Sequence, residues 1–137
     1  MIVIKNKIIP FGSYSCINLL GVVFTKDDMD WRDYNHELLH SHQMLECMFF
    51  TVGLVMGLIA LFDISPWWFL ISPFSFYIYY GLEYLLIRAF HKKQNGAYHD
   101  VSFEEEAYNN ADNYRYISER KWFGWIKYLK IKSYGKS

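Results

Sequence analysis

The chain lacks an excess of charge of either sign, because 14 Lys and Arg balance 14 Asp and Glu over 137 residues. A nucleic-acid-binding surface needs surplus cations to displace the counterions of the phosphates. Neutrality therefore argues against a nucleic-acid partner. Cysteine is also scarce: Cys16 and Cys47 are the only two, and they have no CxxC spacing. They predict two buried thiols and not a disulfide framework.

Charge is almost missing from the middle of the chain. All Lys and Arg lie within residues 1–43 or 88–137, and Asp63 is the only charged residue between Cys47 and Leu82. The apolar stretches on either side of Asp63 reach the length of about 20 residues that a membrane-spanning helix needs. A short chain has little other sequence with which to cover two helices that are apolar on all sides. We therefore predict a helical membrane hairpin over residues 44–87; the alternative is a soluble protein with two buried core helices.

The distribution of cations predicts an orientation for this hairpin. Cytoplasmic segments next to membrane spans are enriched in Lys and Arg, and every Lys and Arg lies on the side of the two termini. Both termini are expected to be cytoplasmic, with Asp63 near the opposite surface. Met1–Lys7 has no apolar run long enough for a cleavable signal peptide.

The polar ends of the chain predict a single domain of mainly α (α+β) class, residues 1–137. In residues 1–43, apolar and β-branched runs predict a short β-hairpin, followed by a helix that Asp33 or Asn35 caps and that continues into the first apolar stretch. In residues 88–137, Ser102 and Glu105 have the spacing of a capping box at the start of a polar helix. The last residues, 119–137, alternate cations with apolar side chains and predict an amphipathic helix that lies on an anionic leaflet or packs on the domain.

The polar helix before the hairpin contains His36-Glu37-Leu38-Leu39-His40. Residues four apart share one face of a helix, so both imidazoles can bind one ion at about 2.0–2.1 Å, the distance typical of zinc. Glu37 lies beside them and can accept a proton from a water that the metal polarises. Gln43 continues the same face one turn later.

A catalytic zinc needs a third protein ligand, and the acidic cluster Glu104-Glu105-Glu106 is the best source. Adjacent acids are also common at a solvated helix start, where the helix dipole favours them. Here Phe103 and Ala107 flank the acids, and the next cation is Arg115. We predict that one of the acids is a ligand, with Glu104 and Glu106 as the two candidates.

The HExxH helix followed by Glu104-Glu105-Glu106-Ala107-Tyr108 resembles the gluzincin metallopeptidases, above all the integral-membrane prenyl-protein protease and heat-shock protease types. This resemblance implies His36, His40 and Glu104 as zinc ligands and Glu37 as the general base. Tyr108 stands where that family has an Asp that contacts a ligand His, and Asp112 is the candidate substitute. The residues around both motifs also resemble those of a family of small uncharacterised bacterial HExxH proteins.

Other ionisable residues have weaker claims. Tyr98 is a candidate donor to a developing oxyanion. His42 lies on another face of the helix, and His91 and His99 are expected at the surface. A membrane di-iron hydroxylase or desaturase binds its metals through several histidine boxes. Five histidines are too few for such a site.

Together these features predict a membrane-bound zinc metallopeptidase of the bacterial inner membrane, with its metal site on the cytoplasmic side. Its expected partners are a peptide or protein substrate and membrane lipid. The alternative is a non-catalytic metal-binding membrane protein with a structural or partner-binding role.

Overall fold

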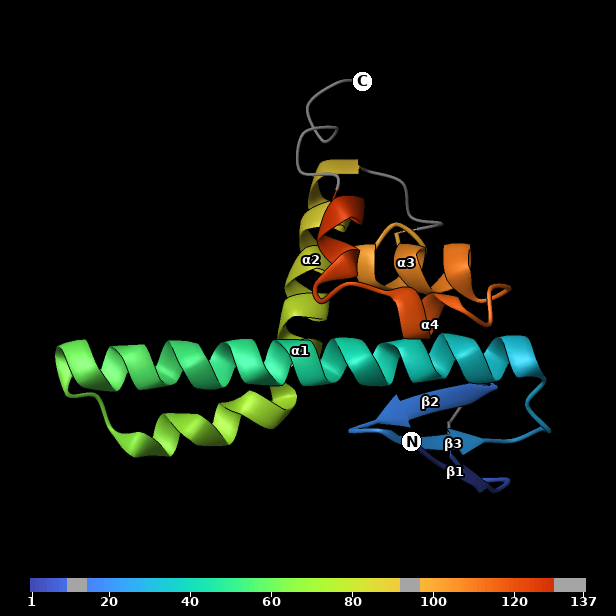
Figure 1. The fold of residues 1–137 in the computed structure, drawn as a ribbon, viewed down its shortest axis with the longest axis horizontal. Helices are drawn as coiled ribbons and strands as arrows, with labels where there is room; N and C mark the ends of the chain where they lie inside the picture. The colour runs from blue at the N-terminus through green and yellow to red at the C-terminus, as the bar shows by residue number, and fades with distance from the viewer. Residues whose placement is uncertain (10–14, 92–96, 130–137) are drawn as a thin grey trace.

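The structure is a computed structural model that describes residues 1–9, 15–91 and 97–129. Its longest element is the helix α1 (Trp31–Phe62), along which the other elements are arranged (Figure 1). Asp30 caps α1, since its carboxylate accepts a hydrogen bond from the Asp33 backbone N–H at 2.8 Å. The helix therefore starts at Trp31, ahead of the predicted caps Asp33 and Asn35. It ends at Asp63, whose φ of 50° is left-handed and whose N–H donates to the Ile59 carbonyl.

A three-stranded sheet lies along the N-terminal half of α1 (Figure 1). A hairpin forms within the second of the two apolar runs and not, as predicted, between the runs: it consists of β2 (Cys16–Leu19) and β3 (Val22–Thr25), joined by a turn in which Leu20 and Gly21 have positive φ. A further strand, β1 (Ile2–Lys5), pairs in parallel with β3, so the strand order is β1-β3-β2. The Asn18 side-chain amide donates to the Glu37 carbonyl at 2.9 Å, which fixes β2 against the motif helix.

The second apolar stretch is divided into two elements. The 3₁₀-helix η1 (Pro66–Phe74) returns along the distal half of α1, and α2 (Ser75–His91) then runs away from α1 crosswise (Figure 1). The sequence predicted one continuous helical leg. A proline inside an α-helix lacks the backbone N–H that the ladder needs, and Pro73 interrupts this segment just before α2 starts at Ser75.

Two helical segments, Trp31–Phe62 and Pro66–Phe90, are long and apolar enough to cross a membrane by length and composition. Only 22% of the residues in the most apolar window of each segment is buried. Both segments therefore present most of their apolar surface outward, unlike the core helices of a soluble domain.

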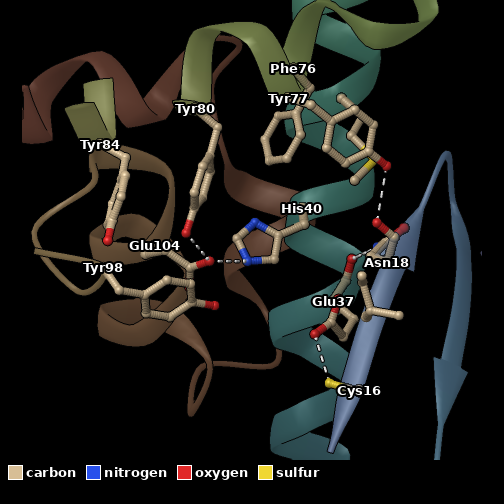
Figure 2. Close-up of a pocket in the computed structure, with 12 residues that line it drawn as sticks. Cys16, Asn18, Glu37, His40, Phe76, Tyr77, Tyr80, Tyr84, Tyr98 and Glu104 are labelled. Carbon is tan, nitrogen blue, oxygen red and sulfur yellow. Dashed lines mark hydrogen bonds and ion pairs between the residues drawn. The ribbon is translucent and has the colours of Figure 1, made fainter. Parts of the chain in front are cut away.

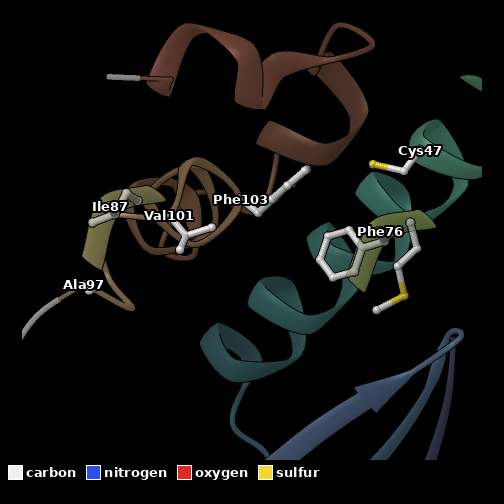
Figure 3. Close-up of a cluster of buried hydrophobic side chains, with 7 residues drawn as sticks. Cys47, Phe76, Ile87, Ala97, Val101 and Phe103 are labelled. Atoms are coloured by element: carbon white, nitrogen blue, oxygen red, sulfur yellow. The ribbon is translucent and has the colours of Figure 1, made fainter. Parts of the chain in front are cut away.

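The remaining helices pack in the angle between α1 and α2. They are α3 (Ser102–Asn110), α4 (Tyr116–Glu119) and the 3₁₀-helix η2 (Gly124–Tyr128). The core lies where α1, α2 and α3 meet (Figure 3), and its buried members are Met44, Cys47, Phe76, Ile87, Ala97, Val101 and Phe103. The molecule is thus mainly helical with a small sheet, which confirms the predicted fold class.

Two local predictions for this region differ from the structure. Ser102 is the first residue of α3 and not its cap, and its N–H and hydroxyl donate to the Glu83 carboxylate at 2.9 and 2.7 Å. A carboxylate from α2 therefore caps α3. The amphipathic tail forms the short elements α4 and η2 in place of one long helix, and residues 130–137 of the tail lie outside the described residues.

Candidate metal centre

Two imidazoles on α1 and one carboxylate on α3 meet at a single point. The Nε2 atoms of His36 and His40 are 3.0 Å apart. The Glu104 carboxylate faces both, with Oε2 at 3.3 Å from His36 Nε2 and Oε1 at 3.5 Å from His40 Nε2. Ligand-type atoms of the three residues all lie within 4.8 Å of one another. The structure thus brings Glu104 of the second motif to the two histidines of the first motif, which lie 64 or more positions earlier in the chain.

The spacing and chemistry of these atoms fit zinc. Ligands at 2.0–2.1 Å in a tetrahedron are about 3.3 Å from one another, close to the observed separations. His40 and Glu104 are buried, and Glu104 Oε2 has no hydrogen-bond donor among the described residues although it is fully enclosed. A buried carboxylate oxygen of this kind is costly unless a cation or donor satisfies it. Two imidazoles and a carboxylate are also the ligand set of known catalytic zinc sites.

The electrostatics of the cluster favour a positive charge at its centre. Burial alone would raise the pKa of Glu104, but the facing imidazoles of His36 and His40 outweigh burial and lower the pKa well below its usual range. Burial likewise disfavours the charged form of His40, and the Glu104 carboxylate more than offsets it, so the pKa of His40 is raised. Each group therefore stabilises an opposite charge on its neighbour.

Glu104 and Glu106, the two candidates for the third ligand, have separate environments. Glu106 accepts hydrogen bonds from Arg120 Nε at 2.9 Å, from Gln43 Nε2 at 2.8 Å and from the Tyr116 hydroxyl at 2.8 Å. These partners hold it away from the histidine cluster. Of the two candidates, Glu104 is the one that clusters with His36 and His40.

Glu37 lies in the cavity that His40 and Glu104 also line (Figure 2). Its buried carboxylate accepts a hydrogen bond from the Cys16 thiol, with Sγ 3.0 Å from Oε1. Burial, followed by the nearby Glu37 carboxylate, raises the pKa of Cys16 to about 12, so the thiol stays protonated as the donor. The cavity has a volume of about 560 Å³ and is lined by Cys16, Ile17, Asn18, Glu37, His40, Met44, Phe76, Tyr77, Tyr80, Tyr84, Tyr98 and Glu104.

Two phenols lie beside Glu104. The Tyr80 hydroxyl donates to Glu104 Oε1 at 3.2 Å, and Tyr98 approaches the same carboxylate from the loop before α3 (Figure 2). Burial and the Glu104 charge raise the pKa of Tyr98, so its hydroxyl remains protonated. Tyr98 thus lines the cavity, which is the position that its predicted role as a donor to an oxyanion requires. Tyr80 has no signal in the sequence, because it is one of several tyrosines in an apolar stretch.

The remaining predicted residues take other positions. Asp112 pairs with Arg32 at 3.2 Å at the surface and does not support a ligand histidine. Tyr108 packs its ring on His36, with centroids 4.6 Å apart, and the His99 ring contacts Tyr108 in a tilted arrangement. His99 is exposed, as expected; His42 is exposed too, and the side chain of His91 falls outside the described part of the chain. The contact predicted for Asp112 is made by Gln43, whose Oε1 is 2.8 Å from His40 Nδ1.

Comparison of the chain with protein-family models, with curated proteins and with solved structures gives no match. The functional argument therefore rests on the arrangement of these side chains.

Proposed function

We propose that the chain is a membrane-bound zinc metallopeptidase with His36, His40 and Glu104 as its metal ligands. The observation that carries this proposal is the His36–His40–Glu104 cluster, of which the buried members His40 and Glu104 line a cavity together with a further carboxylate, Glu37. Three protein ligands leave the fourth position of a tetrahedral zinc open, as in catalytic sites and unlike structural ones.

Zinc in such a site supplies a Lewis acid that lowers the pKa of a water toward about 7. Glu37 is the residue of this chain that accepts the proton of the attacking water and passes it to the leaving amine. The Cys16 thiol, which donates to Glu37, keeps that carboxylate in the cavity. Tyr98 offers a protonated hydroxyl to the negative charge that develops on the carbonyl oxygen of the substrate.

The edge strand β2 offers a place for an extended substrate. In an antiparallel ladder, alternate residues direct their backbone groups away from the partner strand. Ser15 O accepts from Lys26 N at 3.0 Å, so Cys16 and Asn18 point away from β3. An extended peptide can add to such an edge through main-chain hydrogen bonds.

Tyr77 limits the length of this edge. Its hydroxyl accepts from the Leu20 N–H at 2.9 Å and donates to the Asn18 carbonyl at 3.0 Å. These bonds occupy the backbone groups at the far end of β2. Strand addition is therefore restricted to the segment from Cys16 to the Asn18 N–H, which borders the cavity.

The membrane part of the proposal is supported by the outward face of α2. Its exposed apolar side chains recur at helical spacing along the whole element and are 39–62% exposed: Ile78, Leu82, Leu85, Leu86 and Phe90. Exposed apolar side chains of distal α1 and of η1 add to this surface, among them Phe50, Leu54, Leu61, Trp67 and Leu70. Soluble monomers rarely expose apolar patches of such extent. We propose lipid as the partner of this surface and the cytoplasmic side of a bacterial inner membrane as the location of the metal site.

One observation favours a second candidate, a non-catalytic metal-binding membrane protein. The Glu37 carboxylate is directed toward Cys16 on β2 and is not part of the ligand cluster. A carboxylate held in that position needs to turn toward a bound water to act as a base. If it does not turn, the metal serves only to join α1 and α3.

The test compares hydrolysis and zinc content in the same variants. The full chain is purified in detergent, loaded with zinc and incubated with a fluorescence-quenched peptide library. We expect Glu37→Gln to keep zinc and to lose hydrolysis by about 10²–10⁴-fold, the usual contribution of a general base. Glu105→Gln is the matched control, since Glu105 does not line the cavity, and it should keep both zinc and hydrolysis. Full hydrolysis by Glu37→Gln would exclude the mechanism, and a zinc-loaded wild type that cleaves no peptide would support the non-catalytic alternative.

A further inference from the structure

A chain of buried polar side chains starts behind His40 and extends away from the metal centre. His40 Nδ1 is 2.8 Å from Gln43 Oε1, and Gln43 Nε2 is 2.8 Å from Glu106 Oε2. Glu106 in turn binds Arg120 through two hydrogen bonds of 2.9 and 3.0 Å. Arg120 also pairs with Glu46, one turn beyond Gln43 on α1. The chain therefore links α1, α3 and the segment after α4.

The direction of each hydrogen bond follows from the chemistry of the partners. The Gln43 amide nitrogen faces the Phe103 carbonyl at 3.1 Å and the Glu106 carboxylate. A carbonyl and an ionised carboxylate can accept hydrogen bonds but cannot donate them. The Gln43 amide therefore directs its NH₂ toward them and its oxygen toward His40. An oxygen at this position requires a proton on His40 Nδ1. The Nε2 lone pair is then free to face His36 and Glu104.

The Glu106 carboxylate accepts hydrogen bonds from several donors around it. Arg120 and the Tyr116 hydroxyl together direct three donors at its two oxygens. Glu106 is fully buried and the Arg120 side chain is only 4% exposed. Hydrogen bonds between ionised groups are stronger in such a dry environment than in water. The amide of Gln43 consequently has one favourable orientation.

We propose that Gln43 is the positioning residue that fixes His40 in the Nδ1–H tautomer, and that Glu106 and Arg120 set the orientation of Gln43. The group that supports a ligand histidine in metal sites is commonly a carboxylate or a backbone carbonyl; here it is an amide oriented by a buried ion pair. The inference rests on the proposed metal site but not on peptide cleavage, because it concerns the state of His40 itself.

The first experiment measures the tautomer directly. The full chain with ¹⁵N-labelled histidine is purified metal-free in detergent at pH 8.5, and long-range ¹H–¹⁵N correlations assign the protonated nitrogen of His40. We expect the Nδ1–H form in the wild type and a mixture of tautomers in Gln43→Met, which retains length but offers no acceptor oxygen. Zinc affinity, measured by chelator competition, should fall about 10–100-fold in Gln43→Met.

Thr51→Val is the matched control for this substitution. Thr51 is also a buried polar residue of α1, and its hydroxyl bonds to Tyr79 at 2.7 Å, away from the metal centre. This variant should keep the tautomer and the zinc affinity of the wild type. An equal loss of affinity in Thr51→Val would mean that Gln43 acts only through general stability and would overturn the proposal.

A second pair of changes keeps the proposal testable if Gln43→Met does not fold. Gln43→Glu places two carboxylates face to face, and Glu106→Gln removes the charge that orients the amide. The double variant Gln43→Glu/Glu106→Gln exchanges the two groups, so an acceptor again faces His40 and a donor again lies behind it. We expect each single variant to weaken zinc binding and the double variant to recover part of the loss, since the Phe103 carbonyl loses the donor that Gln43 provides. A wild type with the Nε2–H tautomer, or a double variant no better than the single ones, would overturn the proposal.

Discussion

Gly124 provides a sharp test of the buried ion pair, because it lies directly against Glu106. A Cβ atom at position 124 would be 2.3 Å from Glu106 Oε1 and 3.4 Å from Arg120 Nε. Glu106 has no freedom to retreat, since Arg120, Tyr116 and Gln43 hold both of its oxygens. Gly124→Ala must therefore displace η2 or separate Glu106 from Arg120.

The size of the effect follows from these two alternatives. Overpacking a well-filled site by one methyl group costs about 1–3 kcal/mol, and breaking a buried ion pair costs about 3–5 kcal/mol. We expect Gly124→Ala to lower the free energy of unfolding by about 3 kcal/mol, where the two ranges meet. The control is Gly81→Ala in the interior of α2, where a Cβ meets nothing within 4 Å. That variant should gain about 0.5–1 kcal/mol, because alanine favours the helix.

The assay is denaturant unfolding of the full chain in detergent, followed by circular dichroism for the wild type and both variants. A Gly124→Ala protein as stable as the wild type would refute the packing of η2 on Glu106. Equal destabilisation by Gly81→Ala would show that the assay reports glycine replacement in general.

Two further predictions concern the supports of the site. Glu83→Ala removes the carboxylate that caps α3 and should cost about 1–2 kcal/mol of stability. Because Glu104 lies two residues after Ser102, this variant should also bind zinc more weakly in a chelator competition. Unchanged stability and affinity would contradict the role of Glu83. For Cys16, burial and Glu37 raise the pKa from 9.0 to about 12 in the folded chain, so between these pH values the unfolded chain loses a proton that the folded chain keeps. The free energy of unfolding should therefore fall as pH rises from 9 toward 12, and it should fall less steeply in Cys16→Ser; identical pH profiles of the two proteins would show that the thiol is not held by Glu37.

Local patterns predicted the parts of the site that depend on helical spacing. His36 and His40 share a helix face because they are four residues apart, and the acidic cluster supplies the third group of the His36–His40–Glu104 cluster. The class of the fold followed from the apolar stretches and the short strands. These features need only neighbours within a turn or two.

The supporting contacts depend on tertiary packing and have no local pattern. Arg120 lies 74 residues from Glu46 and 14 from Glu106, and nothing in its own surroundings in the sequence distinguishes it from an exposed arginine. The same holds for Cys16, which reaches Glu37 only because β2 lies against α1. The division of the second apolar stretch at Ser75 follows from Pro73, whose effect on the helical ladder outweighs the apolar composition.

Zinc content is the most direct test of the central claim. The full chain, expressed with ample zinc and purified in detergent, is analysed by mass spectrometry of the metal, together with Glu104→Gln and the control Glu105→Gln. We predict one zinc per chain in the wild type and in Glu105→Gln, and its loss in Glu104→Gln, because the Glu104 carboxylate faces both His36 and His40. A wild type without zinc, or a Glu104→Gln protein that retains a full equivalent, would contradict the assignment of this cluster as a metal site.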